Sequence, residues 1–242
     1  MLTLGLSCQR AEREELTIAT AANMQYAMAE LMEVFTAHSG YPCHMVVGSS
    51  GKLTAQILEG APYDVFVSAD IKYPEVLADA GITLGLPIVY AEGKLVLWSA
   101  DLKSVTWELL SDPNIQHIAI PNPEIAPYGR AAKELLTGRQ LWDSLVPKLV
   151  YGESVAQTNQ FIASGAAIMG ITSESTVMAP INKNRGSWQA LDNANYEPIE
   201  QAMVLMKSTP EIEAQSEAFR DFIKSAQGKE ILLKFGFTIP HE

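Results

Sequence analysis

The sequence is poor in the residues that most often hold metals. Two cysteines and four histidines occur among 242 residues, and no two of them stand at CxxC or HxxxH spacing. Structural zinc sites are built from such closely spaced pairs, so a site of this kind is excluded. Runs of 18 or more apolar residues are also missing, so the sequence predicts no membrane-spanning helix.

Basic residues are scarce relative to acidic ones. Lys and Arg total 17 against 28 Asp and Glu, which gives a formal net charge of −11. Proteins that bind nucleic acids or anionic membranes need a basic surface, so neither is an expected partner. Hydrophobic residues make up 48% and charged residues 19%, which is typical of a folded globular chain. The length suits one large domain or two modest ones.

The first residues differ in composition from the rest of the chain. Met1–Cys8 is apolar and ends in a cysteine, and Gln9–Glu15 is polar. This pattern is typical of the end of a lipoprotein export signal, although the basic region and long apolar core of a complete signal are missing. We predict a leader and tether over 1–13, a lipidated Cys8, and a free, buried Cys43 at the second strand. The alternatives are a chance cysteine in a ragged terminus, or a Cys8–Cys43 disulfide.

Apolar runs alternate with helical patterns along the chain. Helices are predicted from Met24 onward with Asn23 as N-cap, at Lys52–Glu59 before Gly60, up to Ala80 before Gly81, near Gly129–Thr137 and Val155–Ala163, and from Glu211 to Ser225. Strands are predicted at Leu16–Ala21, His44–Val47, Asp64–Ser68, Lys94–Trp98, His117–Ile120, Ala167–Ile171 and Ala202–Met206. Repeated strand–turn–helix order predicts an α/β fold with mostly parallel sheets flanked by helices.

The number of strand–helix units exceeds what one compact sheet usually holds. We therefore expect two α/β lobes joined by strands that cross near Pro87–Gly93 and Tyr196–Gln201. The first lobe would comprise residues 14–89 and 200–242. The second lobe would comprise residues 90–199.

Small polar residues stand where predicted strands end and helices begin. They are Asn23, the Ser49-Ser50-Gly51 turn and the Asn122–Gly129 segment. Ligands of open α/β sheets bind outside the carboxyl ends of strands, where helix N-termini carry a partial positive charge. Such turns favour an anion, although the same residue types are also ordinary N-cap and turn residues.

Enzyme motifs are incomplete in this sequence. The GSSGK segment would need Gly at Val46 and Ser or Thr at Leu53 to form a phosphate-binding loop. Asp64 and Asp70 flank an apolar run, and we interpret them as caps of turns rather than as an acid–base pair. The sequence therefore predicts no catalytic residue, and an enzyme on a two-lobe scaffold stays the alternative of another class.

Three separated segments resemble the molybdate-binding proteins of ABC transporters. They are GSSGKLTAQILEGAPYDVFVSAD at Gly48–Asp70, IATAANMQYAM from Ile18 and KFGFTIP from Lys234. The resemblance covers about Leu16–Pro240. It implies a type II periplasmic-binding-protein fold, in which two α/β lobes clamp an oxyanion between them.

The resemblance also implies which groups hold the oxyanion. They are the side chains of Asn23 and Ser50 and the backbone N–H groups of Tyr128 and Val155. Molybdenum would be held as molybdate through these same residues, without a further cofactor. Some members place a Tyr hydroxyl on the anion where this chain has Ser173, which is too short to reach. We therefore expect Asn23 or a water to supply the missing bond.

The resemblance implies an exported solute-binding protein that captures molybdate, and also tungstate, and delivers it to an ABC permease. We expect a monomer in the periplasm or another extracytoplasmic location, anchored to the membrane if Cys8 is lipidated. A receptor for sulfate or phosphate is the alternative within the binding class. Phosphate would need an acceptor for its proton, and Glu153 and Glu174 lie near the matched turns.

Overall fold

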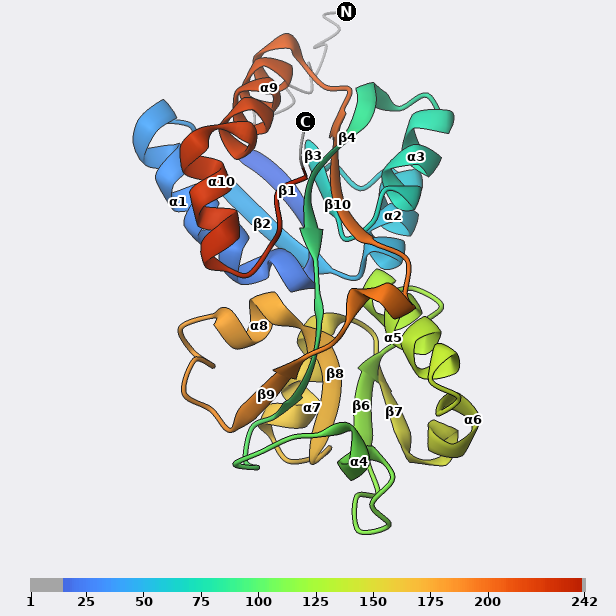
Figure 1. The fold of residues 1–242 in the computed structure, drawn as a ribbon. Helices are drawn as coiled ribbons and strands as arrows, with labels where there is room; N and C mark the ends of the chain where they lie inside the picture. Colours follow the sequence, from blue (N-terminus) through green and yellow to red (C-terminus); the bar gives the residue numbers. More distant parts are fainter. Residues whose placement is uncertain (1–14, 241–242) are drawn as a thin grey trace, which may run out of the picture.

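The computed structural model describes residues 15–240 and contains two five-stranded sheets, each flanked by helices. Figure 1 shows the two sheets one above the other, each within its own lobe. The predicted α/β class with two lobes is confirmed. The leader over 1–13 and the lipidated Cys8 lie outside the described residues.

The sheet of the first lobe has the strand order β2-β1-β3-β10-β4. In it, β1 (Leu16–Ala21) pairs in parallel with β2 (Cys43–Gly48) and with β3 (Val65–Ser68). The long β4 (Thr83–Gly93) and β3 both pair antiparallel with β10 (Ile199–Met206). Four strands therefore run in one direction and β10 runs against them.

The sheet of the second lobe has the order β7-β6-β8-β5-β9 and the same arrangement of directions. Parallel pairs join β6 (Ile118–Pro121) to β7 (Leu149–Gly152) and to β8 (Met169–Ser173). Antiparallel pairs join β5 (Leu95–Ser99) to β8 and to β9 (Ser187–Ala190). The chain passes from the first sheet to the second between β4 and β5, and it returns before β10 (Figure 1).

Both faces of the first sheet are covered by helices. On β3, Val65 and Val67 pack into one apolar cluster and Phe66 into another, because successive side chains of a strand point to opposite faces. Figure 1 shows α1, α9 and α10 over one face and α2 and α3 over the other. The helical elements of this lobe are η1 (Ala22–Met24), α1 (Gln25–Ser39), α2 (Ser50–Leu58), α3 (Lys72–Asp79), α9 (Pro210–Lys224) and α10 (Ala226–Lys234). Burial on both faces explains why the central strand β3 is apolar at three consecutive positions.

The second sheet is covered in the same way. Leu95 and Leu97 of β5 pack into one cluster, and Val96 and Trp98 pack into another on the opposite face. The helical elements here are α4 (Trp107–Leu110), α5 (Pro127–Gly138), α6 (Trp142–Leu145), η2 (Val146–Lys148), α7 (Val155–Ala163), α8 (Glu174–Met178) and η3 (Asn193–Asn195). In the part of the chain that the structure describes, no helix combines the length and the apolarity needed to cross a bilayer.

The helix ends follow the expected chemistry in most places. Gly60 and Gly81 stand one residue beyond the C-cap ends of α2 and α3, directly after Glu59 and Ala80, with positive φ angles of 92° and 72°, a conformation that glycine adopts without strain. The predicted helix up to Ser225 ends at Lys224. Ser225 then starts α10, because its side chain accepts a hydrogen bond from the Gly228 N–H at 3.2 Å.

Cys43 begins β2 and forms no disulfide with any residue between 15 and 240. The prediction of a fully buried thiol is wrong, because the Cys43 side chain is partly exposed. Its strand lies at the edge of the sheet, so one side lacks a neighbouring strand. Partial burial still raises the pKa of the thiol to about 11, which keeps it protonated and unreactive at neutral pH.

Candidate functional site

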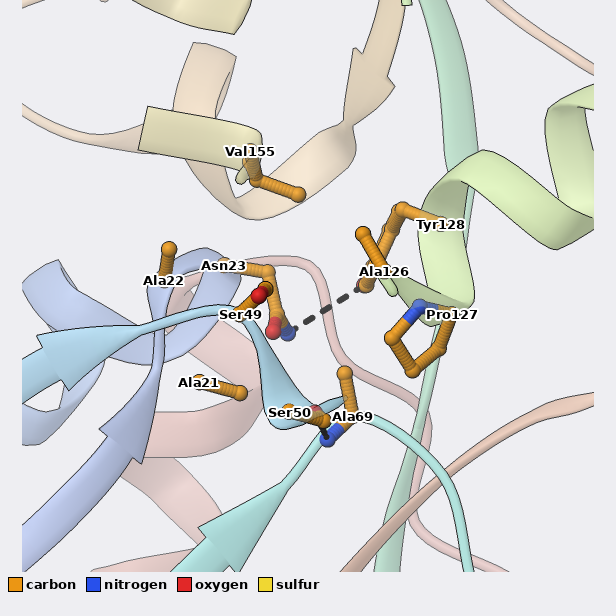
Figure 2. A pocket seen from close by; sticks show the side chains of 10 residues that line it. All are labelled: Ala21, Ala22, Asn23, Ser49, Ser50, Ala69, Ala126, Pro127, Tyr128 and Val155. Atoms are coloured by element: carbon orange, nitrogen blue, oxygen red, sulfur yellow. Dashed lines mark hydrogen bonds between the residues drawn. The ribbon is translucent and has the colours of Figure 1, made fainter. Parts of the chain in front are cut away.

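A small pocket lies between the lobes, at the carboxyl ends of the strands (Figure 2). Its cavity volume is about 10 Å³, far below the roughly 300–1,000 Å³ of sites for drug-sized ligands, so it suits only a ligand of a few atoms. All four residues that we expected to hold an oxyanion line it. The lining consists of Ala21, Ala22, Asn23, Ser49, Ser50 and Ala69 from the first lobe, and Ala126, Pro127, Tyr128 and Val155 from the second.

Four helical segments begin at this pocket. The continuous run of η1 and α1 begins at Ala22, α2 at Ser50, α5 at Pro127 and α7 at Val155. The first N–H groups of a helix have no partner within it, and the helix dipole adds partial positive charge there. None of the ten lining residues is charged. The pocket can therefore attract an anion through backbone donors and dipoles, without a buried Lys or Arg.

Ser50 adds a hydroxyl that is positioned by the first lobe. The side chain is fully buried, and its Oγ accepts a hydrogen bond from the Ala69 N–H at 3.0 Å. This bond connects the start of α2 to the end of β3 (Figure 2). Because Oγ acts as the acceptor in this bond, its own hydrogen remains to be donated toward the pocket.

Asn23 is not the N-cap that the sequence predicted. It lies inside the η1 turn, and α1 has Met24 at its N-cap without a side-chain bond. The Asn23 Nδ2 atom instead donates to Gln201 Oε1 at 2.7 Å and to Tyr128 Oη at 3.4 Å (Figure 2 shows the second bond). The side chain is only 2% exposed, so these buried partners replace a local bond to the backbone.

The orientation of the Asn23 amide is set by Gln201. Gln201 Nε2 donates to the Ile199 carbonyl at 2.9 Å, which directs its Oε1 toward Asn23. The Asn23 nitrogen that we expected to donate to the ligand is therefore already engaged. Its Oδ1 is buried and has no hydrogen-bond partner among residues 15–240. The side chain thus brings an acceptor to the pocket lining, while the backbone N–H of Asn23 lies in the first turn of its helical run.

Tyr128 connects the pocket to one of the crossing segments. Its side chain is 1% exposed and belongs to the apolar core of the second lobe. Its hydroxyl lies so close to Gly93, the last residue of β4, that a Cβ atom at Gly93 would overlap it. Burial raises the pKa of Tyr128 well above its ordinary value, so the hydroxyl stays protonated.

Further hydrogen bonds and one ion pair join the lobes around the pocket. The Gly51 N–H donates to the Ile125 carbonyl at 3.1 Å, and Ser175 Oγ donates to the Asn23 carbonyl at 2.7 Å. Lys52 and Glu153 form an exposed ion pair at 3.3 Å beside the pocket. The lobes are therefore in contact on several sides of the pocket.

Glu153 and Glu174, which we considered as acceptors for a phosphate proton, do not line the pocket. Glu153 is exposed and paired with Lys52, and Glu174 lies 3.9 Å from Lys94. Burial raises the pKa of the Glu174 carboxyl, and the positive charge of Lys94 opposes that shift. Ser173 is also absent from the lining, because its Oγ is bonded to Thr176 Oγ1 at 2.8 Å and to Ser175 Oγ at 2.9 Å. No carboxylate therefore faces the pocket from these positions.

Asp64 and Asp70 flank β3 and both accept bonds from backbone N–H groups, but only Asp70 does so at the start of a helix, as expected of a cap, whereas Asp64 bonds to the neighbouring strand β1. Asp64 Oδ2 accepts from the Thr17 N–H at 2.8 Å, and Asp70 Oδ1 accepts from the Tyr73 N–H at 3.4 Å. Burial raises the pKa of Asp70, against the effects of the Tyr73 N–H and of Arg130. Within residues 15–240, no three His, Cys, Asp or Glu side chains are grouped so that they could hold a metal ion.

Sequence reasoning missed two side chains of the site. Gln201 is fully buried, and an amide directly before the apolar run Ala202–Met206 of its strand was the available signal. Ser49 belongs to the turn that we singled out, but we assigned a ligand role to Ser50 alone. The structure places both serines on the pocket.

Known proteins resemble this chain along nearly its whole length. Bacterial extracellular solute-binding proteins form the family that matches residues 16–238. The molybdate-binding protein ModA of Rhodobacter capsulatus is 37% identical over 239 residues, which cover 98% of this chain and 93% of that protein. The putative ABC transporter substrate-binding lipoprotein YvgL of Bacillus subtilis is 27% identical and covers 92% of this chain and 86% of its own length.

A solved structure agrees with the fold in detail. The periplasmic molybdate-binding protein of Azotobacter vinelandii has a TM-score of 0.88 with this chain and is 38% identical to it. The match covers 93% of this chain and 100% of that one. Together with the two sheets and the pocket between the lobes, these matches show that the chain belongs to the family of bacterial extracellular solute-binding proteins.

Proposed function

We propose that this protein captures molybdate, and also tungstate, and delivers it to the permease of an ABC transporter. The observation that carries the proposal is the convergence of four helix N-termini on an uncharged pocket that also holds the Ser50 hydroxyl. The names of the matched proteins from Rhodobacter and Azotobacter support molybdate as the oxyanion. These matched proteins are solute-binding proteins rather than enzymes.

The chemistry of the ligand fits the chemistry of the pocket. A fully deprotonated tetrahedral dianion offers only acceptors, so N–H and O–H donors satisfy it. We propose as ligands the Ser50 hydroxyl and the backbone N–H groups of Asn23, Tyr128 and Val155. Donors and dipoles act more strongly in a closed site from which water is excluded. No separate cofactor is needed for this binding.

Closure of the lobes would also supply the signal for transport. The ligand groups come from both lobes, so a bound anion favours the closed form over the open one. The permease could then distinguish the loaded receptor from the empty one by its shape. We propose that the protein acts as a monomer in this cycle.

We further propose an extracytoplasmic location with a lipid anchor at Cys8. The family description and the lipoprotein name of the Bacillus relative support this location. The mass of the native protein, isolated from its own membrane, tests the anchor. A diacylglycerol adduct on Cys8 would support it, and a disulfide between Cys8 and Cys43 would refute it.

A thermal-shift series tests the proposed ligand. Molybdate or tungstate at about one hundred times its dissociation constant should add about 2.7 kcal/mol to the free energy of unfolding. For a chain of this size, this corresponds to a rise in melting temperature of about 5–10 °C. Sulfate at the same concentration should give almost no shift. Its S–O bonds are shorter than the metal–oxygen bonds of molybdate and tungstate, so its oxygens do not reach several of the donors.

Phosphate is the stricter control in that series. Its proton needs an acceptor, and the pocket lining contains one in Asn23 Oδ1, although no carboxylate faces the pocket from Glu153 or Glu174. We expect phosphate to give almost no shift, because one neutral amide oxygen is a weaker acceptor than a carboxylate. A phosphate shift as large as that of molybdate would favour the phosphate-receptor alternative.

A further inference from the structure

Ser49 occupies a capping position without capping its helix. It directly precedes α2, and its side chain makes no hydrogen bond to the first turn of that helix. The serines and threonine at the equivalent position of α7, α9 and α10 do accept such bonds, namely Ser154, Thr209 and Ser225. Ser173 also precedes its helix, α8, without capping it, but its hydroxyl bonds to Ser175 and Thr176 instead. Because serine is favoured at this position for the capping bond, a serine that does not cap is expected to have another partner.

The Ser49 hydroxyl is also buried without a partner. The residue is 4% exposed, and Oγ makes no hydrogen bond within residues 15–240. Burying an unpaired hydroxyl costs free energy, and most buried hydroxyls are therefore bonded. Of the buried side-chain atoms in residues 15–240 that lack a partner, Ser49 Oγ and Asn23 Oδ1 line the pocket, and of these two Ser49 Oγ is the one with a hydrogen to donate.

The position of Ser49 indicates what that partner is. Ser49 and Ser50 both line the pocket between the lobes, close to Asn23 (Figure 2). The Asn23 nitrogen is engaged by Gln201, and Asn23 Oδ1 forms no hydrogen bond with Ser49. The Ser49 hydroxyl is thus a donor on the pocket that no group in the described part of the chain accepts from.

We propose that the Ser49 hydroxyl donates a hydrogen bond directly to the bound oxyanion, beside the hydroxyl of Ser50. The inference rests on the proposed function of the pocket. It assigns two hydroxyl donors from consecutive residues to the ligand. The bound oxyanion would then be the partner that the Ser49 hydroxyl lacks within residues 15–240.

Calorimetric titration of Ser49→Ala with molybdate tests the inference. Loss of one donor to a charged ligand should weaken binding by about ten- to a hundredfold. The melting temperature of the unliganded variant should be unchanged or higher than that of the wild type, because an unpaired buried hydroxyl has been removed. A residue with a merely structural role would not give this combination.

Ser225→Ala is the matched control, because Ser225 does not line the pocket. Ser225 caps α10 and donates to the Phe222 carbonyl at 2.6 Å, so its replacement should lower the melting temperature and leave molybdate affinity unchanged. Wild-type affinity in Ser49→Ala would overturn the inference, whatever its melting temperature. Failure of the wild type to bind any of molybdate, tungstate, sulfate and phosphate would instead overturn the proposed function.

Discussion

Replacing Gly93 with alanine should lower the stability of the protein and weaken molybdate binding together. A Cβ atom at this position overlaps the hydroxyl of Tyr128, whose ring is held by the core of the second lobe. Overpacking of this kind costs about 1–3 kcal/mol of the free energy of unfolding. The Tyr128 N–H belongs to the proposed ligand set, so any displacement of α5 also weakens binding, by an expected tenfold or more. Denaturant unfolding and calorimetric titration measure the two effects.

Gly138→Ala is the matched control for this substitution. Gly138 is the last residue of α5, and a Cβ there would meet only the Asn195 carbonyl oxygen at an ordinary distance of 3.8 Å. Alanine should be tolerated or slightly stabilising at this site. If Gly93→Ala behaved like Gly138→Ala in both measurements, the close packing of Tyr128 against Gly93 would be needed neither for stability nor for molybdate binding.

Ser50→Ala should produce the second large effect. The variant loses the hydroxyl that we propose as a ligand donor, and molybdate affinity should fall about ten- to a hundredfold. It also leaves the Ala69 N–H without its partner at the end of β3, which should cost about 1–3 kcal/mol of stability. Calorimetry with molybdate and unfolding of the unliganded protein separate the two losses.

The comparison with Ser49→Ala sharpens this prediction. Both variants should bind molybdate more weakly, but only Ser50→Ala should destabilise the unliganded protein, because only Ser50 has a protein partner. If Ser50→Ala were less stable but bound molybdate as tightly as the wild type, the Ser50 hydroxyl would serve only to bond the Ala69 N–H and would not contact the ligand.

The parts of the site that local patterns encode could be predicted from the sequence. Ser50 and Val155 were placed correctly at helix starts, because strand, turn and helix follow one another within a few residues there. That two such turns from different lobes meet at one pocket followed from the topology of α/β folds and from the resemblance to a known family.

The parts that depend on distant partners could not be predicted. Asn23 reads as an N-cap in its own segment, but its amide bonds to Gln201, which is 178 residues away along the chain. The strands β7 and β9 form the two edges of the second sheet, and their partly exposed residues give a weak periodic signal. Their assignment required the neighbouring strands, which the sequence alone does not place.

Isothermal titration of the wild-type protein with molybdate, repeated in the presence of excess sulfate, tests the central claim most directly. The claim is that the uncharged pocket at four helix N-termini binds one molybdate per chain and discriminates against sulfate. We expect one site per chain, with an apparent affinity that a hundredfold excess of sulfate over molybdate leaves nearly unchanged. Absence of molybdate binding, or displacement of molybdate by sulfate at equal concentration, would contradict the account.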